Sequence, residues 1–437
     1  MSNRSKKLLL LFGDMFLFVA SMMCTVLIDK HSLAVTKYLE QHLLITMILT
    51  PIWVSVFFIE GLYSLRVFNR NGLIISLLRS VLFSSVVTVI FFYLFGGIFG
   101  ITPKTNLIIF GCITFVFVFL WRKIFFKVFS YKVFTRNVVF VGNSSTFTEL
   151  KDLFNKKGYL GFSIKAHVKS MNNYKPDYDT KLLVIEDNLL GSEDIGTELF
   201  NLLNTGKSIL SLSEFSEVIS GKVPLEAIDH TWFIDSRINL NQGSYYFSKI
   251  FIDHVIAILG ICLLFPLVLI LIPILYLVSG KPILYSQDRV GLNNKVFKIF
   301  KFRTMNLNAE ENGAKWSPVN DDRITLIGKF LRTTRIDEIP QLWNVLNGTM
   351  SLVGPRPERP EIIEQKLINV IPFYNYRHLV KPGISGWAQV NYGYGASEND
   401  SLIKLQYDLF YVKNKSSWLD LRIILKTIKI VIGKIGR

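Results

Sequence analysis

Asp337 and Glu338 are adjacent carboxylates in the segment RIDEIPQLWNVLNGTMSLVGPRPERPE (335–361). Proline fits only in the first turn of a helix, so Pro340 places the pair at or just before a helix start, where free N–H groups attract carboxylates and phosphates. One interpretation is that a single acid caps this helix. Neighbouring residues point about 100° apart around a helix axis, so one cap does not need both. Two acids can also divide the work of a reaction: one attacks or binds Mg²⁺, and the other orients a group or takes up a proton.

Arg356 and Arg359 follow in the loop SLVGPRPERP (351–360), which contains three prolines. Prolines fix the backbone, so the two guanidinium groups are held in place before any ligand arrives. The planar fork of arginine suits two-point binding of phosphate oxygens. The loop therefore predicts a phosphate site, and a rigid surface loop is the alternative.

Two further runs bring cations to the same half of the chain, namely YSQDRVGLNNKVFKIFKFRTM (285–305) and YRHLVKPGISGWAQVNYG (376–393). The candidate ligand-binding residues in these runs are Arg289, Lys301, Arg303, Arg377, Lys381 and Gln389. Together with the acid pair they predict a site of phosphate size, in which arginines hold a diphosphate and Mg²⁺ bridges it to Asp337 and Glu338.

The composition indicates that a membrane positions this site. Half of the 437 residues are hydrophobic and the net charge is +16. A basic, apolar chain is typical of a membrane protein with its positive side on anionic lipid, whereas a nucleic-acid binder would carry less apolar sequence. Nucleic acid is therefore not an expected partner. The three cysteines lie far apart in apolar runs and predict neither a disulfide framework nor a metal site.

Four apolar segments at residues 8–28, 43–62, 73–99 and 106–129 each approach or exceed the length that spans a bilayer as a helix. Lys and Arg concentrate before the first segment, between the second and third, and after the fourth. By the positive-inside rule both ends of this region are cytoplasmic. Asp14 and Arg79 fall within or at the ends of these segments, where snorkelling or pairing between helices explains them better than a functional charge.

Residues 134–236 have the composition of a cytoplasmic α/β domain. The short apolar runs NVVFVGNSS (137–145) and KLLVIED (181–187) predict parallel strands. Gly142 ends the first strand, but the turn after it lacks the further glycines that let a pyrophosphate approach. We therefore expect a degenerate Rossmann-like domain with a regulatory or spacer role, with nucleotide binding as the weaker alternative.

The apolar run 250–278 differs from the first four because Pro266 and Pro273 interrupt it, which predicts a break or kink near Pro266. If this run crossed the membrane, the basic segment 295–303 would lie on the wrong side for the charge rule. A re-entrant helix that enters and leaves by the cytoplasmic face fits better, and a kinked spanning helix is the alternative. The tail 417–437 predicts an amphipathic basic helix on the membrane surface or, alternatively, a soluble helix with a solvated face.

The three motifs quoted above resemble those of the bacterial polyprenyl-phosphate sugar-1-phosphate transferases, in particular the large multi-span undecaprenyl-phosphate glucose or galactose phosphotransferases. The resemblance covers residue 249 to the C-terminus. It implies a four-helix transmembrane region (1–130), a cytoplasmic Rossmann-like α/β domain (134–236), and a mainly α-helical membrane-associated catalytic domain (245–437) with a re-entrant helix at 250–278. Lys249, Asp253 and Pro266 correspond to the family's re-entrant helix.

The resemblance also implies a reaction that primes exopolysaccharide or capsule synthesis at the bacterial cytoplasmic (inner) membrane. A hexose-1-phosphate passes from a UDP-sugar, glucose first and galactose second, to undecaprenyl phosphate, and UMP is released. Asp337 would carry the phospho-sugar covalently, while Glu338 would assist through Mg²⁺ or the lipid acceptor. The large members further suggest a homodimer whose catalytic domain faces the cytoplasm and contacts membrane lipid.

Two residues depart from the family pattern. Phe265 stands before the proline where the family often has Ser, and Thr349 stands where many members have Asp. Two other functions remain open: a membrane glycosyltransferase that transfers only the sugar and releases UDP, and a non-catalytic scaffold or regulator of polysaccharide export.

Overall fold

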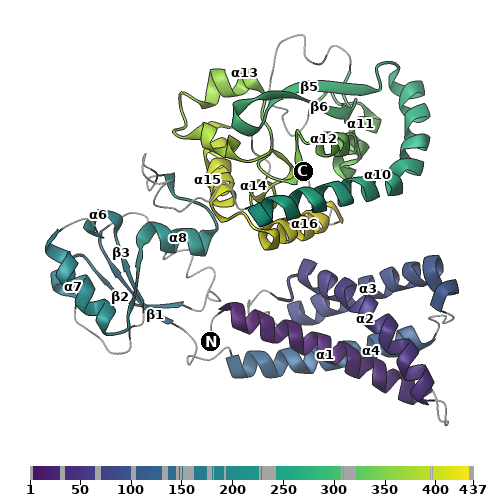
Figure 1. The fold of residues 1–437 in the computed structure, drawn as a ribbon, viewed down its shortest axis with the longest axis horizontal. Coiled ribbons are helices and arrows are strands. Elements are labelled where there is room, and N and C mark those ends of the chain that lie inside the picture. The colour runs from purple at the N-terminus through teal and green to yellow at the C-terminus, as the bar shows by residue number, and fades with distance from the viewer. Residues whose placement is uncertain are drawn as a thin grey trace. The chain divides into compact units, whose positions relative to one another are not determined.

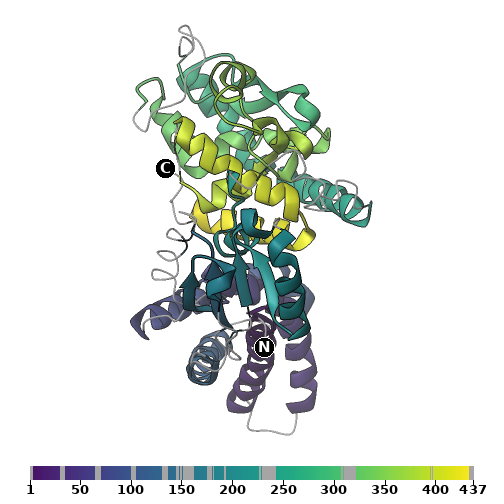
Figure 2. The same cartoon turned by 90° about the vertical axis from the view of Figure 1, so that its left-hand side faces the viewer.

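The chain forms two compact units, Met1–Leu212 and Ser213–Arg437. The computed structural model describes residues 3–29, 35–63, 70–99, 105–129, 136–143, 147, 150, 162–174, 180, 182–190, 193–225, 228, 243–306, 309, 321–393, 395 and 397–432 (Figures 1 and 2). The three-domain division expected from the sequence stays a prediction.

Four apolar helices open the first unit: α1 (Asn3–Asp29), α2 (Val35–Ile59), α3 (Arg70–Phe99) and α4 (Thr105–Phe129). Helix α1 packs against α2 and α4, and α3 packs against the same two helices (Figure 1). By length and composition α1, α3 and α4 each contain a segment able to cross a membrane, which makes the chain a membrane protein. Helix α2 contains the apolar stretch Leu43–Ile59, so the helix ends before residue 62, where the second expected span was predicted to end.

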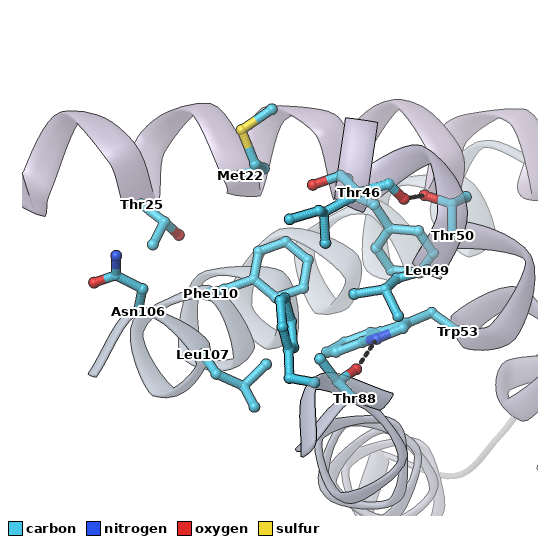
Figure 3. A pocket seen from close by; sticks show the side chains of 13 residues that line it. Met22, Thr25, Thr46, Leu49, Thr50, Trp53, Thr88, Asn106, Leu107 and Phe110 are labelled. Carbon is cyan, nitrogen blue, oxygen red and sulfur yellow. Dashed lines mark hydrogen bonds between the residues drawn. The ribbon is translucent and has the colours of Figure 1, made fainter. Parts of the chain in front are cut away.

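Polar contacts inside this bundle join different helices. Asp14 of α1 and Arg122 of α4 form an ion pair of 2.6 Å with both side chains fully buried. Pairing between helices is thus the observed arrangement for Asp14, while Arg79 is exposed on α3. A cavity of ≈ 80 Å³ also lies in the bundle, where Trp53 donates a 3.0 Å hydrogen bond to Thr88 (Figure 3).

The rest of the first unit holds a parallel sheet in the order β2-β1-β3-β4, as the sequence predicted. Its elements are β1 (Arg136–Val141), β2 (Phe162–Val168), the 3-10 turn η2 (Met171–Asn173), β3 (Leu182–Ile185), α6 (Asp187–Leu190), α7 (Glu193–Asn204) and β4 (Ser208–Ser211). After β1 the Glu186 carboxylate accepts a 2.7 Å hydrogen bond from the Asn143 N–H, and a Cβ on Gly142 would lie 2.4 Å from the same carboxylate. A negative group thus lies beside this turn, which disfavours a phosphate there. The Rossmann-like assignment itself stays a prediction.

The second unit is mainly helical, with two small pairs of strands. Its first elements are α8 (Leu212–Ser220), α10 (Gly243–Ser279), β5 (Leu284–Val290), η4 (Leu292–Asn294), β6 (Val296–Phe302), α11 (Leu326–Thr334), η5 (Ile336–Glu338) and α12 (Gln341–Leu346). The later ones are β7 (Ser351–Val353), α13 (Pro360–Ile362), η6 (Ile363–Leu367), η7 (Tyr374–Leu379), β8 (Gly383–Ser385), α14 (Trp387–Asn391), α15 (Glu398–Asn414) and α16 (Ser417–Ile432). Strands β5 and β6 form an antiparallel hairpin, and β7 pairs in parallel with β8.

Helix α10 runs through Pro266 and Pro273 without interruption, and Figure 1 shows that its course bends. The helix is therefore not broken at Pro266, and proline is a common cause of a bend because it removes one helical hydrogen bond. Most of its apolar side chains are exposed, and it is long and apolar enough to cross a membrane. Whether it spans or re-enters stays a prediction.

Part of the apolar face of the C-terminal helix α16 packs against the interior of the second unit. Leu419 and Ile423 are buried in a cluster with Val353, Trp387 and Tyr411. This contact supports the alternative of a helix packed on the domain, and attachment of its remaining surface to a membrane stays a prediction.

Candidate active site

The acid pair lies in the short 3-10 turn η5, between α11 and α12. Arg335, in the left-handed conformation with φ 60°, ends α11 and begins this turn. Asp337 and Glu338 are 6% and 8% exposed. Pro340 is the residue from which α12 starts, so the predicted place of the pair just before a helix is confirmed.

Three cationic side chains surround Glu338. Its Oε1 lies 2.8 Å from Arg356 Nη2, 3.4 Å from Arg335 Nη1 and 3.6 Å from Lys301 Nζ. Burial by itself would raise the pKa of the Glu338 carboxyl, but the charges of Arg356, Lys301 and Arg335 outweigh it and hold that pKa well below its ordinary range. Glu338 is therefore an anion that holds cations in place. We call Asp337, Glu338, Lys301, Arg335 and Arg356 the ion cluster.

The environment of Asp337 differs from that of its neighbour. Its Oδ1 is buried and has no hydrogen-bond partner among the described residues. Burial raises the pKa of the Asp337 carboxyl, and the adjacent negative charge of Glu338 raises it further. An unpartnered buried carboxylate oxygen is costly, and such atoms concentrate at functional sites. The two acids thus have different environments, with one anchored and one available for bond formation or metal binding.

The β5–β6 hairpin supplies two of the predicted cations. Lys301, near the end of β6, lies beside Glu338, and burial lowers the pKa of its amine to about 8 despite the charge of Glu338. Arg289 of β5 donates to the carbonyl of Pro357 at 3.1 Å and to Gln287 at 2.7 Å. Arg289 therefore ties the hairpin to the proline-rich loop that carries Arg356.

Arg377 also supports this loop. Its Nη2 donates a 2.8 Å hydrogen bond to the carbonyl of Arg356 and lies 2.7 Å from the Asp408 carboxylate. Its Nη1 donates to Tyr374. Arg377 and Asp408 are 6% and 1% exposed, so these contacts are shielded from water. The geometry supports a role in positioning Arg356, and direct phosphate binding by Arg377 stays a prediction.

Other predicted residues have contacts elsewhere in the second unit. Arg303 donates to the carbonyls of Ser279 and Gly280 at the end of α10, while Gln389 donates to Ile384 O at 3.4 Å. Lys381 is half-buried near Gly348, and Arg359 is the residue from which α13 starts. Their roles in ligand binding remain predictions.

The predicted residues of α10 tie it to the base of the proline-rich loop. Lys249 Nζ donates to Val353 O at 3.0 Å and lies 2.8 Å from Asp420 Oδ2, and Asp253 accepts a 3.3 Å hydrogen bond from Leu352 N. Pro266 lies farther along the same helix. These contacts hold β7, which leads into the loop of Arg356.

Two residues of this site were not singled out from the sequence. Arg335 contacts Glu338, and its spacing three residues before that acid was the available signal. Asn344 is fully buried and donates from Nδ2 to Lys298 O at 2.8 Å, joining α12 to β6. Thr349, the departure from the family pattern, hydrogen-bonds to Asn347 Oδ1 at 2.7 Å and so closes the turn after α12.

The residues present fit Mg²⁺ only in part. Among the described residues no group of three or more His, Cys, Asp or Glu side chains could hold a metal ion. Mg²⁺ is often bound by one or two carboxylates together with substrate phosphates, and the free Oδ1 of Asp337 suits such a site. The Oε1 of Glu338 faces three cations, which makes Glu338 the weaker donor.

Comparison with known proteins gives consistent matches. Residues 244–434 match the family described as bacterial sugar transferase. A UDP-N-acetylgalactosamine-undecaprenyl-phosphate N-acetylgalactosaminephosphotransferase of Aeromonas hydrophila is 42% identical over 228 residues, which are 52% of this chain and 53% of that protein. A UDP-glucose:undecaprenyl-phosphate glucose-1-phosphate transferase of Klebsiella pneumoniae is 32% identical over 319 residues, 67% of each chain. A galactosyl transferase of Streptococcus agalactiae is 30% identical over 351 residues, 70% of this chain and 75% of that protein. The match thus spans about half the length of the first of these relatives.

Proposed function

The chain belongs to the polyprenyl-phosphate sugar-1-phosphate transferase family, and we propose that it transfers a hexose-1-phosphate from a UDP-sugar to undecaprenyl phosphate, releasing UMP. Glucose is our first expectation for the sugar and galactose the second, and the names of the relatives add N-acetylgalactosamine. We place the reaction at the bacterial cytoplasmic membrane, on its cytoplasmic side, and we propose a homodimer. The product would prime exopolysaccharide or capsule synthesis.

The observation that carries this proposal is the contrast between the two acids of the pair. Asp337 keeps a buried oxygen without a hydrogen-bond partner in the described part of the chain, and the adjacent anionic Glu338 contacts three cations. In the first step, Asp337 Oδ1 attacks the sugar-bearing phosphorus, an O–P bond forms, and the bond to the bridging oxygen breaks as UMP leaves. In the second step, a phosphate oxygen of the lipid attacks the same phosphorus and frees the aspartate. Two bulky anions can thereby use one site in turn.

The cations of the ion cluster would bind and orient the diphosphate. Arg356 makes the shortest contact with Glu338, and its backbone is held by Arg377, so its guanidinium is positioned before the donor arrives. Lys301 adds a charge from the hairpin. We propose that Asp337 and Glu338, completed by substrate phosphates, hold Mg²⁺, which when bound would offset the negative charge of the diphosphate.

The released nucleotide tests the proposal directly. Full-length protein in nanodiscs is given Mg²⁺, undecaprenyl phosphate and, separately, UDP-glucose, UDP-galactose and UDP-N-acetylgalactosamine. We expect UMP from one preferred donor. Repeated turnover should require undecaprenyl phosphate, because only the acceptor frees the aspartate. UDP as the product would identify a glycosyltransferase, and no nucleotide from any donor would favour a scaffold.

The pKa of Lys301 leads to a prediction about pH. Its amine has a pKa of about 8, so it is cationic below pH 8 and loses its charge above it. Since the charged amine is the form that binds phosphate, kcat/KM for the UDP-sugar should fall between pH 7 and pH 9. The variant Lys301→Arg stays charged throughout this range, and its profile should be flat. If kcat/KM fell equally in the wild type and in Lys301→Arg, the titrating group would be another residue or the substrate.

A further inference from the structure

Residues 216–225 run from the second half of α8 into the body of the second unit, and we call this segment the strap. Helix α8 begins at Leu212, directly after β4 ends at Ser211. Within the strap, Glu217 and Val223 are buried. Connections between elements usually run over the surface, where their side chains are exposed. The strap is instead packed into the second unit.

The strap is fastened to helix α15 at two places. Glu217 lies 2.7 Å from Lys413 Nζ and accepts a 2.9 Å hydrogen bond from Asn414 Nδ2. Farther along, the N–H of Val223 donates a 3.0 Å hydrogen bond to the carbonyl of Gln406. The side chain of Val223 is 1% exposed in an apolar cluster that also contains residues of α15. The two attachments are about two helical turns apart, so they fix the direction of α15 as well as its place.

The strap also holds the indole of Trp387. Its Nε1 donates a 2.7 Å hydrogen bond to the carbonyl of Gly221, and its ring stacks on Phe410 of α15 with 5.6 Å between the centroids. Gly221 has a φ of 72°, and a Cβ at this position would lie 3.3 Å from the indole. A larger residue here is therefore strained and crowds the ring. Trp387 is 4% exposed, so this hydrogen bond is shielded from water.

Helix α15 leads from the strap to the backbone of Arg356. Asp408 lies between the two places where the strap holds α15, and its carboxylate is 2.7 Å from Arg377 Nη2. The same Nη2 donates a 2.8 Å hydrogen bond to the carbonyl of Arg356. Asp408 is 1% exposed and cannot move without its helix. The place of α15 therefore sets the place of this hydrogen bond.

Trp387 leads from the strap to the same loop by a second route. It begins α14, two residues after β8 ends at Ser385. The carbonyl of Ser385 accepts a 2.9 Å hydrogen bond from the N–H of Gly354, and the carbonyl of Pro355 accepts another of 2.9 Å from β8. Gly354 and Pro355 directly precede Arg356. The two partners of the strap thus hold the loop on both sides of one peptide group.

We propose that the strap is a positioning element of the candidate active site. By fixing α15 and Trp387 it fixes the backbone from which the guanidinium of Arg356 reaches Glu338. The inference rests on the proposed function, because the position of Arg356 matters for the reaction only if this guanidinium binds the diphosphate. A misplacement of about 1 Å by a distant change can lower a rate about 10²-fold. The strap acts through Arg356 and does not itself touch a substrate.

The first test removes the charge of Glu217 in the full-length protein in nanodiscs. Glu217→Gln keeps the size of the side chain, but it loses the ion pair with Lys413. We expect kcat/KM for the UDP-sugar to fall about tenfold, because α15 is then held less firmly. The matched control is Glu198→Gln, the same charge change at an exposed position of α7, which should alter kcat/KM less than about twofold.

A double-mutant cycle separates positioning from a general loss of stability. If the strap acts through Arg356, Glu217→Gln should lower kcat/KM by less than about twofold once Arg356 is already alanine. If the strap only stabilises the second unit, the loss of about tenfold should persist in the Arg356→Ala background. Persistence of that loss would overturn the proposal.

Hydrogen exchange reports the position of the loop without any turnover. In peptide 350–361 we expect the amide of Gly354 to exchange faster in Glu217→Gln than in the wild type. Trp387→Phe, which loses the indole donor, should have the same effect. Peptide 341–346 of α12 should keep its rate in both variants. Unchanged exchange of the loop peptide in both variants, or equally faster exchange in the α12 peptide, would overturn the proposal.

Failure of the proposed function would look different. If no donor yields UMP, the kinetic measurements have no signal, but hydrogen exchange still decides whether the strap positions the loop. If UMP forms and Asp337→Asn abolishes it, while Glu217→Gln loses no activity, the function stands and the inference fails.

Discussion

Replacing Asp337 with asparagine is expected to lower kcat for UMP release by at least about 10⁴-fold, since removing a nucleophile leaves only binding and electrostatic contributions. Asparagine keeps the size of the side chain but replaces a carboxylate oxygen by a neutral amide. The Oδ1 that has no partner among the described residues is the atom that the proposed mechanism uses to attack phosphorus. The measurement is single-turnover UMP release from the preferred donor, followed by intact-mass detection of the phospho-sugar adduct on the wild type.

The control for this prediction is to check that Asp337→Asn is folded, by comparing its melting temperature with that of the wild type. Asp337 Oδ1 makes no hydrogen bond to the described residues, and its burial and the charge of Glu338 both disfavour its anionic form, so neutral asparagine should not lower the melting temperature. Residual activity within about tenfold of wild type, in a folded variant, would rule out Asp337 as the nucleophile. An adduct that mapped to Glu338 would reverse the roles of the pair.

Replacing Arg356 with alanine is expected to lower kcat/KM for the UDP-sugar by about 10²- to 10³-fold, the size typical of losing one preorganised electrostatic contact. Arg356 makes the shortest ion pair in the ion cluster, 2.8 Å to Glu338, and its backbone is held by Arg377 and, through Pro357, by Arg289. The position of its charge is therefore fixed by these contacts. Arg356→Lys restores a charge without the planar fork and should recover only part of the loss.

The matched control is a cation from the hairpin that lies outside the ion cluster. Lys298 pairs with Asp288 at 3.0 Å on the surface, with exposed fractions of 64% and 50%. Exposed ion pairs contribute little, so Lys298→Ala should change kcat/KM less than about twofold. Equal losses in Arg356→Ala and Lys298→Ala would indicate a general effect of net charge rather than a specific role of Arg356.

Three predictions that rested on local pattern were confirmed. Pro340 located the acid pair before α12, because the constraint of a proline acts within one turn of the chain. The long apolar runs gave α1, α3, α4 and α10 for the same reason, since helix length and composition are local properties. Parallel strands after the first bundle followed from short apolar runs between helical stretches.

The partners of the basic residues could not be derived in this way. Arg356 and Arg377 look equivalent in the sequence, but one contacts Glu338 and the other hydrogen-bonds to the backbone of Arg356 beside a buried Asp408. Asp408 lies far along the chain from both the acid pair and the loop, and no spacing rule connects them. The same holds for Lys249, whose partner Asp420 comes from α16.

By itself, the sequence determined the motifs, the apolar helices and the presence of an acid pair among cations, because each of these depends on residues close together in the chain. The tertiary structure decided which cations reach Glu338 and which of them only support the loop. It also left Asp337 Oδ1 buried without a hydrogen bond to the part of the chain that the structure describes. The same packing brought α8 and α15 together through Glu217 and Lys413. Contacts between distant segments depend on how whole elements pack, and that packing is a property of the fold rather than of any single stretch of residues.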